Sequence, residues 1–332
     1  MKRALITAEF DQQAIRQLET MGFSVELAGW GQTRRVLGES ELADLVSGVS
    51  LLVVEVEQVT RGVIAAAGDL EIIATCRAGP VNVDMAAATA AGISVLCTPG
   101  RNADSVADFV IGLFLALGRN IWQADNHLRR HGWHVGADIP YFHFRGPELA
   151  HATLGLVGCG AIGRFVAQRA RGLGMDVLGY DPFLCQQDVG EAIRLCHLPE
   201  VLEQADFLSL HVPLSEGTRS MIGGPELARM KPTSYLINTA RAAVVEEEAL
   251  FALLEERKIA GAALDVFWEE PLPDGSPWLR LDNVLLTPHI AGAADHVKVH
   301  HSAMVIEDVR TLLAGGQPAR RVNDPDIDPG IG

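Results

Sequence analysis

Four polar residues in the second half of the chain each follow an apolar run of strand-like sequence. They are His211 after FLSL, Arg241 after LINTA, Asp265 after AAL and His289 after LLTP. Parallel sheets bind ligands outside the carboxyl ends of their strands. A guanidinium can hold a carboxylate with two hydrogen bonds, and an imidazole can exchange a proton near neutral pH. This combination suits hydride chemistry on the carbonyl of a small acid.

A glutamate near His289 would complete this set. The sequence DVFWEEP offers Glu269 and Glu270, and either carboxylate can accept a hydrogen bond from the second ring nitrogen of the histidine. We expect Arg241 and His289 to act on the substrate and Asp265 to face the amide of a nicotinamide. The alternatives are a structural salt bridge for Arg241, a core position for His289 and a helix-cap role for Asp265.

The stretch TLGLVGCGAIGR places Gly158, Gly160 and Gly163 in a GxGxxG pattern between an apolar strand and a helix. The first glycine allows a tight turn, the second lets a pyrophosphate approach the backbone, and the third lets the helix pack closely on the strand. Asp181 follows the next strand, where its carboxylate can accept from both ribose hydroxyls and would repel a 2′-phosphate. The pattern therefore predicts a dinucleotide site that prefers NAD to NADP.

The elements that must position these residues are short β-branched runs alternating with amphipathic stretches. This alternation is typical of parallel sheets covered by helices. A long helix is expected over 104–130 and an irregular connection over 131–149. A last helix over 293–314, with His300–His301 on its surface, is expected to pack on the first α/β unit and to be followed by a loose tail. The expected strands are 4–7, 51–56, 71–76, 93–98, 153–158, 176–181, 207–212, 235–239, 262–266 and 284–288.

The composition excludes several classes of protein. A chain of 332 residues, 48% of them apolar, can form two domains, and a net charge of −15 argues against nucleic-acid or membrane partners. No apolar run is long enough to span a bilayer, and the first residues read as a strand rather than a signal peptide. Four of the five cysteines lie in or beside apolar runs, without a CxxC or any metal-ligand spacing. We therefore expect buried thiols, no metal and a cytoplasmic location.

Ordered motifs along nearly the whole chain resemble the family of D-isomer-specific 2-hydroxyacid dehydrogenases, whose members include D-3-phosphoglycerate and glycerate dehydrogenases. The matching stretches are, in order, CRAGPVNVD, TPGRNADSVADFVIGLFLALGRN, GPELAHATLGLVGCGAIGR, LGYDP, LHVPLSEGTRSMI, MKPTSYLINTARAAVV, GAALDVFWEEPL and NVLLTPHIAG. The resemblance implies an α/β fold with two doubly wound parallel-sheet domains. A Rossmann NAD-binding domain of residues 104–295 would be inserted in a flavodoxin-like substrate domain of residues 1–103 and 296–332.

The resemblance also implies the site residues. The catalytic set maps to Arg241, Glu270 and His289, which selects Glu270 over Glu269. The substrate carboxylate would be held by backbone N–H groups of Ala78–Gly79–Pro80 together with Arg241, with Arg77 and Asn102 as further candidates. The implied NAD contacts are Gly158, Gly160, Ala161, Ile162, Gly163, Asp181, His211, Val212, Pro213, Thr218, Thr239, Ala240, Arg241, Asp265, His289, Ala291 and Gly292.

Two departures from the family pattern bear on the substrate. The loop RAGPVNVD is shorter than usual and carries Pro80, which has no N–H to offer a carboxylate. Asn82 or Asn102 could supply an amide instead. Two glycines that often follow the arginine in the family are replaced here by Ala242 and Ala243.

We therefore expect reversible hydride transfer between NAD and C2 of a small D-2-hydroxy acid, giving a 2-oxo acid, as in D-3-phosphoglycerate dehydrogenases. One alternative is a dehydrogenase of a sugar-derived or phosphorylated acid, for which Arg77, Arg101 and Arg145 are available. A second alternative is an NAD-sensing protein similar to the corepressors of this family. The aromatic segment 105–150 is expected to form a homodimer interface, unless it is buried on its own cofactor domain.

Overall fold

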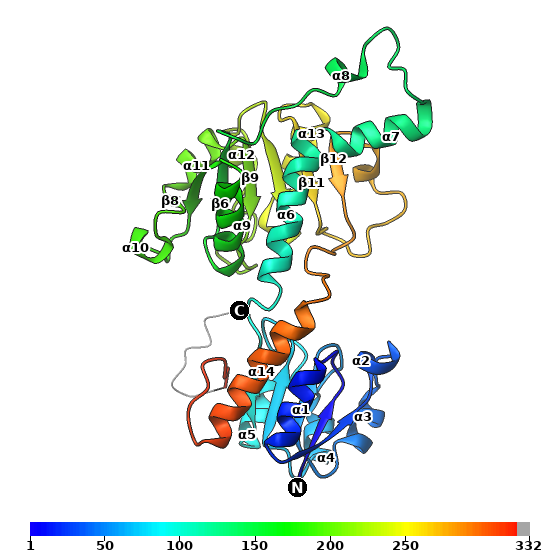
Figure 1. Cartoon of the computed structure of the whole chain (residues 1–332), viewed down its shortest axis with the longest axis vertical. Coiled ribbons are helices and arrows are strands. Elements are labelled where there is room, and N and C mark those ends of the chain that lie inside the picture. Colours follow the sequence, from blue (N-terminus) through cyan, green and yellow to red (C-terminus); the bar gives the residue numbers. More distant parts are fainter. Residues whose placement is uncertain (324–332) are drawn as a thin grey trace. The chain divides into compact units, whose positions relative to one another are not determined.

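The structure, a computed structural model, describes residues 1–323 and divides the chain into two compact α/β units (Figure 1). The first unit comprises Met1–Asn102 together with the described residues from Ala294 onward, and the second comprises Ala103–Ala293. All pairings between the named strands are parallel in both sheets. The predicted fold class, two doubly wound parallel-sheet domains, is confirmed.

The first unit has a five-stranded sheet in the order β2-β1-β3-β4-β5, which is the flavodoxin-like order. Its strands are β1 (Lys2–Ile6), β2 (Phe23–Leu27), β3 (Val49–Val54), β4 (Ile72–Thr75) and β5 (Ser94–Leu96). Its helices are α1 (Gln12–Thr20), α2 (Trp30–Thr33), α3 (Glu39–Leu45), α4 (Arg61–Ala66), α5 (Met85–Ala90) and α14 (Val297–Leu313).

Side chains of this sheet alternate between two covered faces. Ala4 and Ile6 pack on one face with α1 and α14, whereas Leu5 packs on the other with α3 and α4. Burial on both sides explains why a strand such as β3 is apolar almost throughout and fully buried. In Figure 1 the orange α14 lies beside the blue α1, so the last helix of the chain belongs to the first sheet.

The second unit has a seven-stranded sheet in the order β12-β11-β10-β9-β6-β7-β8, in which β6 to β11 follow the Rossmann order. Its strands are β6 (Thr153–Val157), β7 (Asp176–Tyr180), β8 (Arg194–Leu195), β9 (Phe207–Leu210), β10 (Tyr235–Asn238), β11 (Gly261–Leu264) and β12 (Val284–Leu286). Its helices are α6 (Ala103–Gly118), α7 (Ile121–His131), α8 (Pro140–His143), α9 (Ala161–Gly172), α10 (Gln186–Val189), α11 (Leu198–Gln204), α12 (Gly224–Leu227), η1 (Ala242–Val244), α13 (Glu247–Glu255) and η2 (Pro277–Arg280).

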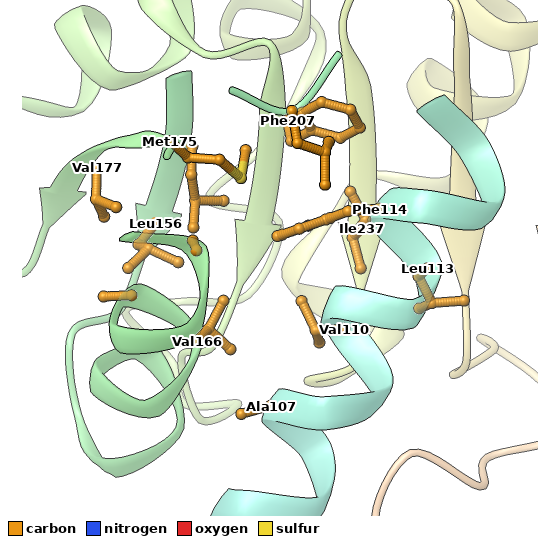
Figure 2. Close-up of a cluster of buried hydrophobic side chains, with 14 of the residues drawn as sticks. Ala107, Val110, Leu113, Phe114, Leu156, Val166, Met175, Val177, Phe207 and Ile237 are labelled. Atoms are coloured by element: carbon orange, nitrogen blue, oxygen red, sulfur yellow. The ribbon is translucent and has the colours of Figure 1, made fainter. Parts of the chain in front are cut away.

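The core of the second unit is built around α6, which packs against α9 and the sheet (Figure 2). Phe114 of this helix meets Phe207 of β9 with 5.3 Å between ring centroids. Val110 and Val166, from α6 and α9, belong to the same buried cluster. This packing fixes the helix that begins at the Gly-rich turn against the sheet that carries the polar residues.

The prediction of one long helix over 104–130 is wrong, because the segment forms α6 and α7, which are bent by 59°. A Cβ on Gly118 would lie 2.9 Å from the Phe207 ring, and the next turn closes with Asn120 at φ 53°. Asparagine adopts this left-handed conformation more readily than most residues. Among residues 1–323, only this bent pair, and no single helix, has the length and apolar character that a membrane span needs.

Other sequence-based expectations also need correction. The prediction did not include β2 or the two-residue β8. The prediction of a loose tail is wrong for residues 320–323. Val322 N–H donates to Val95 O at 2.9 Å, and Arg321 forms an antiparallel β-bridge with Leu96 of β5. The rest of the tail, 324–332, lies outside the described residues.

His301 is not a surface residue either, because it lies on the buried side of α14 and is 1% exposed. Three cysteines are buried, whereas Cys185 is exposed and Cys196 half-buried.

Candidate active site

Strand register brings the polar residues of the second unit into one row. The ends of β7, β6, β9, β10, β11 and β12 lie opposite one another, as Tyr180, Val157, Leu210, Asn238, Leu264 and Leu286. Because each strand stops at the same level, the next residue of each falls at one edge of the sheet. This edge carries, in order, Asp181, Gly158, His211, Thr239, Asp265 and Thr287.

The three glycines of the GxGxxG turn serve different purposes. Gly158 has φ 94°, and a Cβ there would lie 2.7 Å from the backbone of His211. A Cβ on Gly163 would lie 2.3 Å from the carbonyl oxygen of Gly158. Gly160 has an ordinary φ of −72° and would meet nothing within 4 Å. The fold itself therefore requires glycine at 158 and 163, whereas the glycine at 160 keeps a space open in front of the turn.

Unpaired backbone N–H groups beside that space indicate which kind of ligand it can bind. The N–H groups of Gly160, Ala161 and Ile162 at the start of α9 have no acceptor among residues 1–323. Unpaired amides and the positive end of a helix dipole attract phosphate. Asp181 lies at the rim, where its carboxylate accepts from Cys159 N–H at 3.0 Å and from Phe183 N–H at 3.1 Å. These residues fit the pyrophosphate and ribose of NAD.

Two buried polar atoms of the same edge lack a partner among the described residues, His211 Nδ1 and Thr239 Oγ1. The other ring nitrogen of His211 lies 2.9 Å from Ser209 Oγ, and burial lowers the pKa of His211 to about 3, so the ring is neutral. Buried polar atoms without partners are rare in folded proteins, and a bound cofactor would satisfy them. Further along the same loop, Thr218 Oγ1 donates to the carbonyl oxygen of Pro213 at 2.6 Å.

The turn that presents Arg241 is shaped by Asn238, a residue that the sequence did not single out. The buried Asn238 amide accepts from Ala240 N–H and donates to Arg241 O, both at 3.0 Å. The exposed guanidinium of Arg241 makes one contact, from Nη1 to Ala240 O at 2.7 Å. Its remaining donors have no partner among residues 1–323 and are available to a ligand.

Asp265 anchors the loop that carries His289. Its carboxylate is fully buried and accepts from Thr287 Oγ1 at 2.6 Å, Ile290 N–H at 2.9 Å and Ala291 N–H at 2.8 Å. Between these contacts His289 takes a left-handed backbone conformation with φ 55°. Non-glycine residues held in this region gather at functional sites, because the surroundings must offset the strain. The structure therefore gives Asp265 a positioning role, and its contact with nicotinamide stays a prediction.

His289 pairs with Glu270. The Nδ1 atom of the histidine lies 2.8 Å from Glu270 Oε2, and the other carboxylate oxygen accepts from Phe267 N–H at 3.0 Å. Burial alone would raise the pKa of Glu270, but the hydrogen bonds from His289 and Phe267 and the charge of Arg241 outweigh it and lower that pKa. Glu270 is thus an anion that orients the imidazole, and Glu269 is not the residue brought to it.

A pair of stacked tryptophans ties the Glu270 loop to the segment after Arg241. Trp268 stacks on Trp278 with 5.4 Å between ring centroids, and its Nε1–H donates to Val245 O at 3.1 Å. Trp278 in turn donates to Glu247 Oε1 at 3.1 Å. The sequence analysis does not single out this pair, although Trp268 lies within the DVFWEEP motif and Trp278 follows it closely.

The predicted substrate loop lies in the first unit, directly after β4. The N–H groups of Ala78 and Gly79 have no acceptor among residues 1–323, and a Cβ on Gly79 would meet nothing within 4 Å. The suggestion that Asn82 offers its amide to a ligand is wrong. Its buried side chain donates to Glu57 O and accepts from Thr75 Oγ1, both at 2.9 Å. Asn102 is half-buried, and its side chain makes no hydrogen bond within the described part of the chain.

Comparison with known proteins agrees with this geometry. The family model for the NAD-binding domain of D-isomer-specific 2-hydroxyacid dehydrogenases matches residues 111–291. A D-3-phosphoglycerate dehydrogenase of Methanocaldococcus jannaschii is 38% identical over 98% of this chain, which spans 60% of that relative's length. A glyoxylate reductase of Korarchaeum cryptofilum is 38% identical over 97% of this chain and 96% of its own length.

Solved structures agree as well. The TT0316 protein of Thermus thermophilus matches with a TM-score of 0.79 and 33% identity, over 96% of this chain and 99% of that one. The predictions of the family, the oxidoreductase class and NAD as the cofactor are confirmed. The chain belongs to the family of NAD-binding, D-isomer-specific 2-hydroxyacid dehydrogenases.

Proposed function

We propose that the protein catalyses reversible hydride transfer between NAD and C2 of a small D-2-hydroxy acid, with the 2-oxo acid as the other partner. The observation that carries this proposal is the His289–Glu270 contact of 2.8 Å on the same unit as the Gly160 turn and Arg241. Relatives named as D-3-phosphoglycerate dehydrogenase, glyoxylate reductase and hydroxypyruvate reductase support a small acid as the substrate.

His289 is the proton-exchanging group in this proposal. A carboxylate only accepts hydrogen bonds, so Nδ1 of His289 carries the hydrogen directed at Glu270 and Nε2 is left to meet the substrate. During oxidation Nε2 takes the proton of the C2 hydroxyl, and during reduction the imidazolium returns it to the carbonyl oxygen. Glu270 stabilises the imidazolium by its charge. Bound NAD supplies or accepts the hydride.

Arg241 binds the acid in this proposal. The free donors of the Arg241 guanidinium hold the substrate carboxylate and polarise the C2 carbonyl. In the first unit, the predicted carboxylate donors are the unpaired N–H groups of Ala78 and Gly79, together with Arg77 and Asn102. Asp181 favours NAD over NADP, because a 2′-phosphate would be repelled by its carboxylate.

The proposal includes a homodimer formed through the segment 105–150. No residue of α7 is buried, and Trp133, Ile139 and Tyr141 are 70%, 58% and 77% exposed. An apolar surface of this kind is typical of a protein interface. The α6 part of the segment is buried on its own unit, so the proposed interface is formed by α7 and the residues that follow it. Light scattering on the purified protein tests the dimer, and Tyr141→Asp should shift the mass towards the monomer.

The five free cysteines support a reducing, cytoplasmic location.

A kinetic screen tests the proposed reaction. The oxidation of D- and L-2-hydroxy acids and the reduction of 2-oxo acids are followed at 340 nm with NAD(H) and NADP(H). We expect turnover with D acids and a preference for NAD(H). Turnover of L acids alone would contradict the proposed D specificity, and a preference for NADP(H) would contradict the role of Asp181.

A further inference from the structure

Two charged side chains from different segments hold Cys159, the residue between the first two glycines of the Gly-rich turn. Asp181, directly after β7, accepts a hydrogen bond from Cys159 N–H at 3.0 Å. Arg164, the fourth residue of α9, donates from Nε to Cys159 O at 3.1 Å. The thiol of Cys159 is itself buried. The backbone of this residue is therefore held at its donor and at its acceptor, although a glycine flanks it on either side.

The direction of the Arg164 side chain follows from its place in the helix. Side chains of an α-helix lean towards its N-terminus, and Arg164 is close enough to that end to fold back over the turn. The other two arginines of α9, Arg169 and Arg171, pair with carboxylates. Within residues 1–323, Arg164 forms no such ion pair, and its side chain makes only the hydrogen bond to Cys159 O. Hydrogen bonding by this side chain therefore acts on the turn alone.

This hydrogen bond fixes the direction of a neighbouring donor. The C=O of Cys159 and the N–H of Gly160 belong to one trans peptide group, in which they point in opposite directions. Because Arg164 holds the carbonyl oxygen, the Gly160 N–H is turned to the other side. That N–H has no acceptor within the described part of the chain, and a Cβ on Gly160 would meet nothing within 4 Å. It is one of the N–H groups that fit the pyrophosphate of NAD.

Without the arginine, this peptide group could turn over. A flip of the peptide changes ψ of Cys159 and φ of Gly160 together, and glycine adopts positive and negative φ about equally well. Gly160 has φ −72° in the structure and would tolerate the opposite sign. In the flipped turn, a carbonyl oxygen would take the place of the N–H in front of the phosphates. A charged donor on that oxygen opposes the flip, since hydrogen bonds from charged groups are stronger than those between neutral groups.

We propose that Arg164 is a positioning residue of the cofactor site, which keeps the Gly160 N–H turned towards the pyrophosphate of NAD. The proposal deepens the proposed function and rests on the assignment of the Gly-rich turn to the cofactor. A turn that already has the binding conformation loses less conformational freedom when the cofactor binds, so the affinity is higher. Arg164 acts through the backbone and needs no contact with the phosphates.

Arg164→Met tests the proposal, because methionine keeps much of the length of the side chain but has no donor. The Kd values of NADH, ADP and adenosine are measured by calorimetric titration. We expect the Kd of NADH and ADP to rise by about 5- to 20-fold, and that of adenosine, which has no phosphate, to change by less than about twofold. The midpoint of urea unfolding should stay that of the native protein.

Two matched variants serve as controls. Arg164→Lys can still donate to Cys159 O and should keep the Kd of NADH within about threefold of the native value. Arg171→Met removes the same charge near the other end of α9 and should bind NADH like the native protein. A loss in Arg164→Lys or in Arg171→Met as large as that in Arg164→Met would overturn the proposal.

A double substitution separates positioning of the turn from direct binding of the phosphates. In Gly160→Ala, alanine itself resists the flip, so adding Arg164→Met should raise the Kd of NADH further by less than about twofold. An additional rise as large as that in the native background would mean that Arg164 acts on the cofactor independently of this peptide group, and would overturn the proposal.

The remaining outcomes are also decisive. If the native protein binds neither NADH nor ADP, the cofactor site itself is refuted. If it binds both and Arg164→Met binds them equally well, only the role of Arg164 is overturned. Equal losses for ADP and adenosine, or a lower midpoint of urea unfolding, would give Arg164 a merely structural role and overturn the proposal as well.

Discussion

The substitution Gly160→Ala tests whether position 160 must be glycine for cofactor binding rather than for folding. In Gly160→Ala the new methyl group projects into the space in front of the Gly-rich turn, where it meets no protein atom within 4 Å. The backbone φ of −72° is ordinary for alanine. The substitution should therefore reduce the free energy of unfolding by less than about 1 kcal/mol, which is the difference between glycine and alanine at a helix N-cap.

The loss of cofactor affinity should be much larger. A pyrophosphate that approaches the N–H groups of residues 160–162 closely enough to hydrogen-bond would collide with the methyl group. Retreat by the phosphate weakens two or three hydrogen bonds to a charged group, so we expect the Kd of NADH to rise by roughly 10- to 100-fold, equivalent to ~1.4–2.7 kcal/mol. Gly163→Ala should behave in the opposite way and destabilise the apo protein by ~1–3 kcal/mol, because its Cβ would lie 2.3 Å from Gly158 O.

Two measurements decide the matter. NADH affinity is obtained by fluorescence titration, and stability by urea denaturation of the apo protein. Gly172→Ala is a suitable control, since its Cβ is also free of neighbours but lies at the far end of α9. It should bind NADH like the native protein. Native affinity in Gly160→Ala, or a loss of stability as large as that of Gly163→Ala, would refute the assignment of this turn to the pyrophosphate.

Three further substitutions test the elements around the site. Trp268→Phe keeps the ring on Trp278 but loses the hydrogen bond to Val245, so kcat should fall ~3- to 10-fold while the Kd of NADH stays unchanged; an unchanged kcat would dismiss the positioning role. In Asp265→Asn the side-chain NH2 group faces the backbone N–H groups of residues 290 and 291, and one hydrogen bond is lost. The free energy of unfolding, measured by urea denaturation, should fall by ~2–3 kcal/mol, and kcat should be lower. The pKa of His211, about 3 when folded, lies below its unfolded value, so the unfolded chain binds more protons and stability falls as pH drops from about 6.5 towards 3. Replacing His211 by Asn should reduce this slope by ~1.4 kcal/mol per pH unit, and an equal slope in both proteins would mean that the ring is not buried neutral.

The positions of the main site residues could be predicted because parallel strands in register deliver the next residue of each strand to one edge. Asp181, Gly158, His211, Thr239 and Asp265 follow strands whose ends pair directly. The apolar runs alone locate these strand ends within a residue or two. The GxGxxG spacing then identifies the edge as a dinucleotide site without knowledge of the tertiary structure.

Contacts between distant segments could not be predicted in this way. Which loops meet decides the hydrogen bonds of the Asn238 amide and the burial of Asp265 under residues 287–291. It also decides the contacts of Arg101 with Glu55 and His301. The sequence predicts His301 on the surface, because a pair of histidines on a helix is polar, whereas the structure buries one face of α14. The break at Asn120 lies close to the point where the Phe207 ring approaches Gly118, a contact between segments far apart in the sequence.

We infer that His289 exchanges the proton of the C2 oxygen while it takes little part in binding the cofactor. The decisive experiment is the single-turnover oxidation of NADH by a 2-oxo acid in His289→Gln, followed at 340 nm. We predict a rate about 10²- to 10⁴-fold below that of the native protein, with the Kd of NADH changed by less than about threefold. A single-turnover rate equal to that of the native protein would contradict the claim.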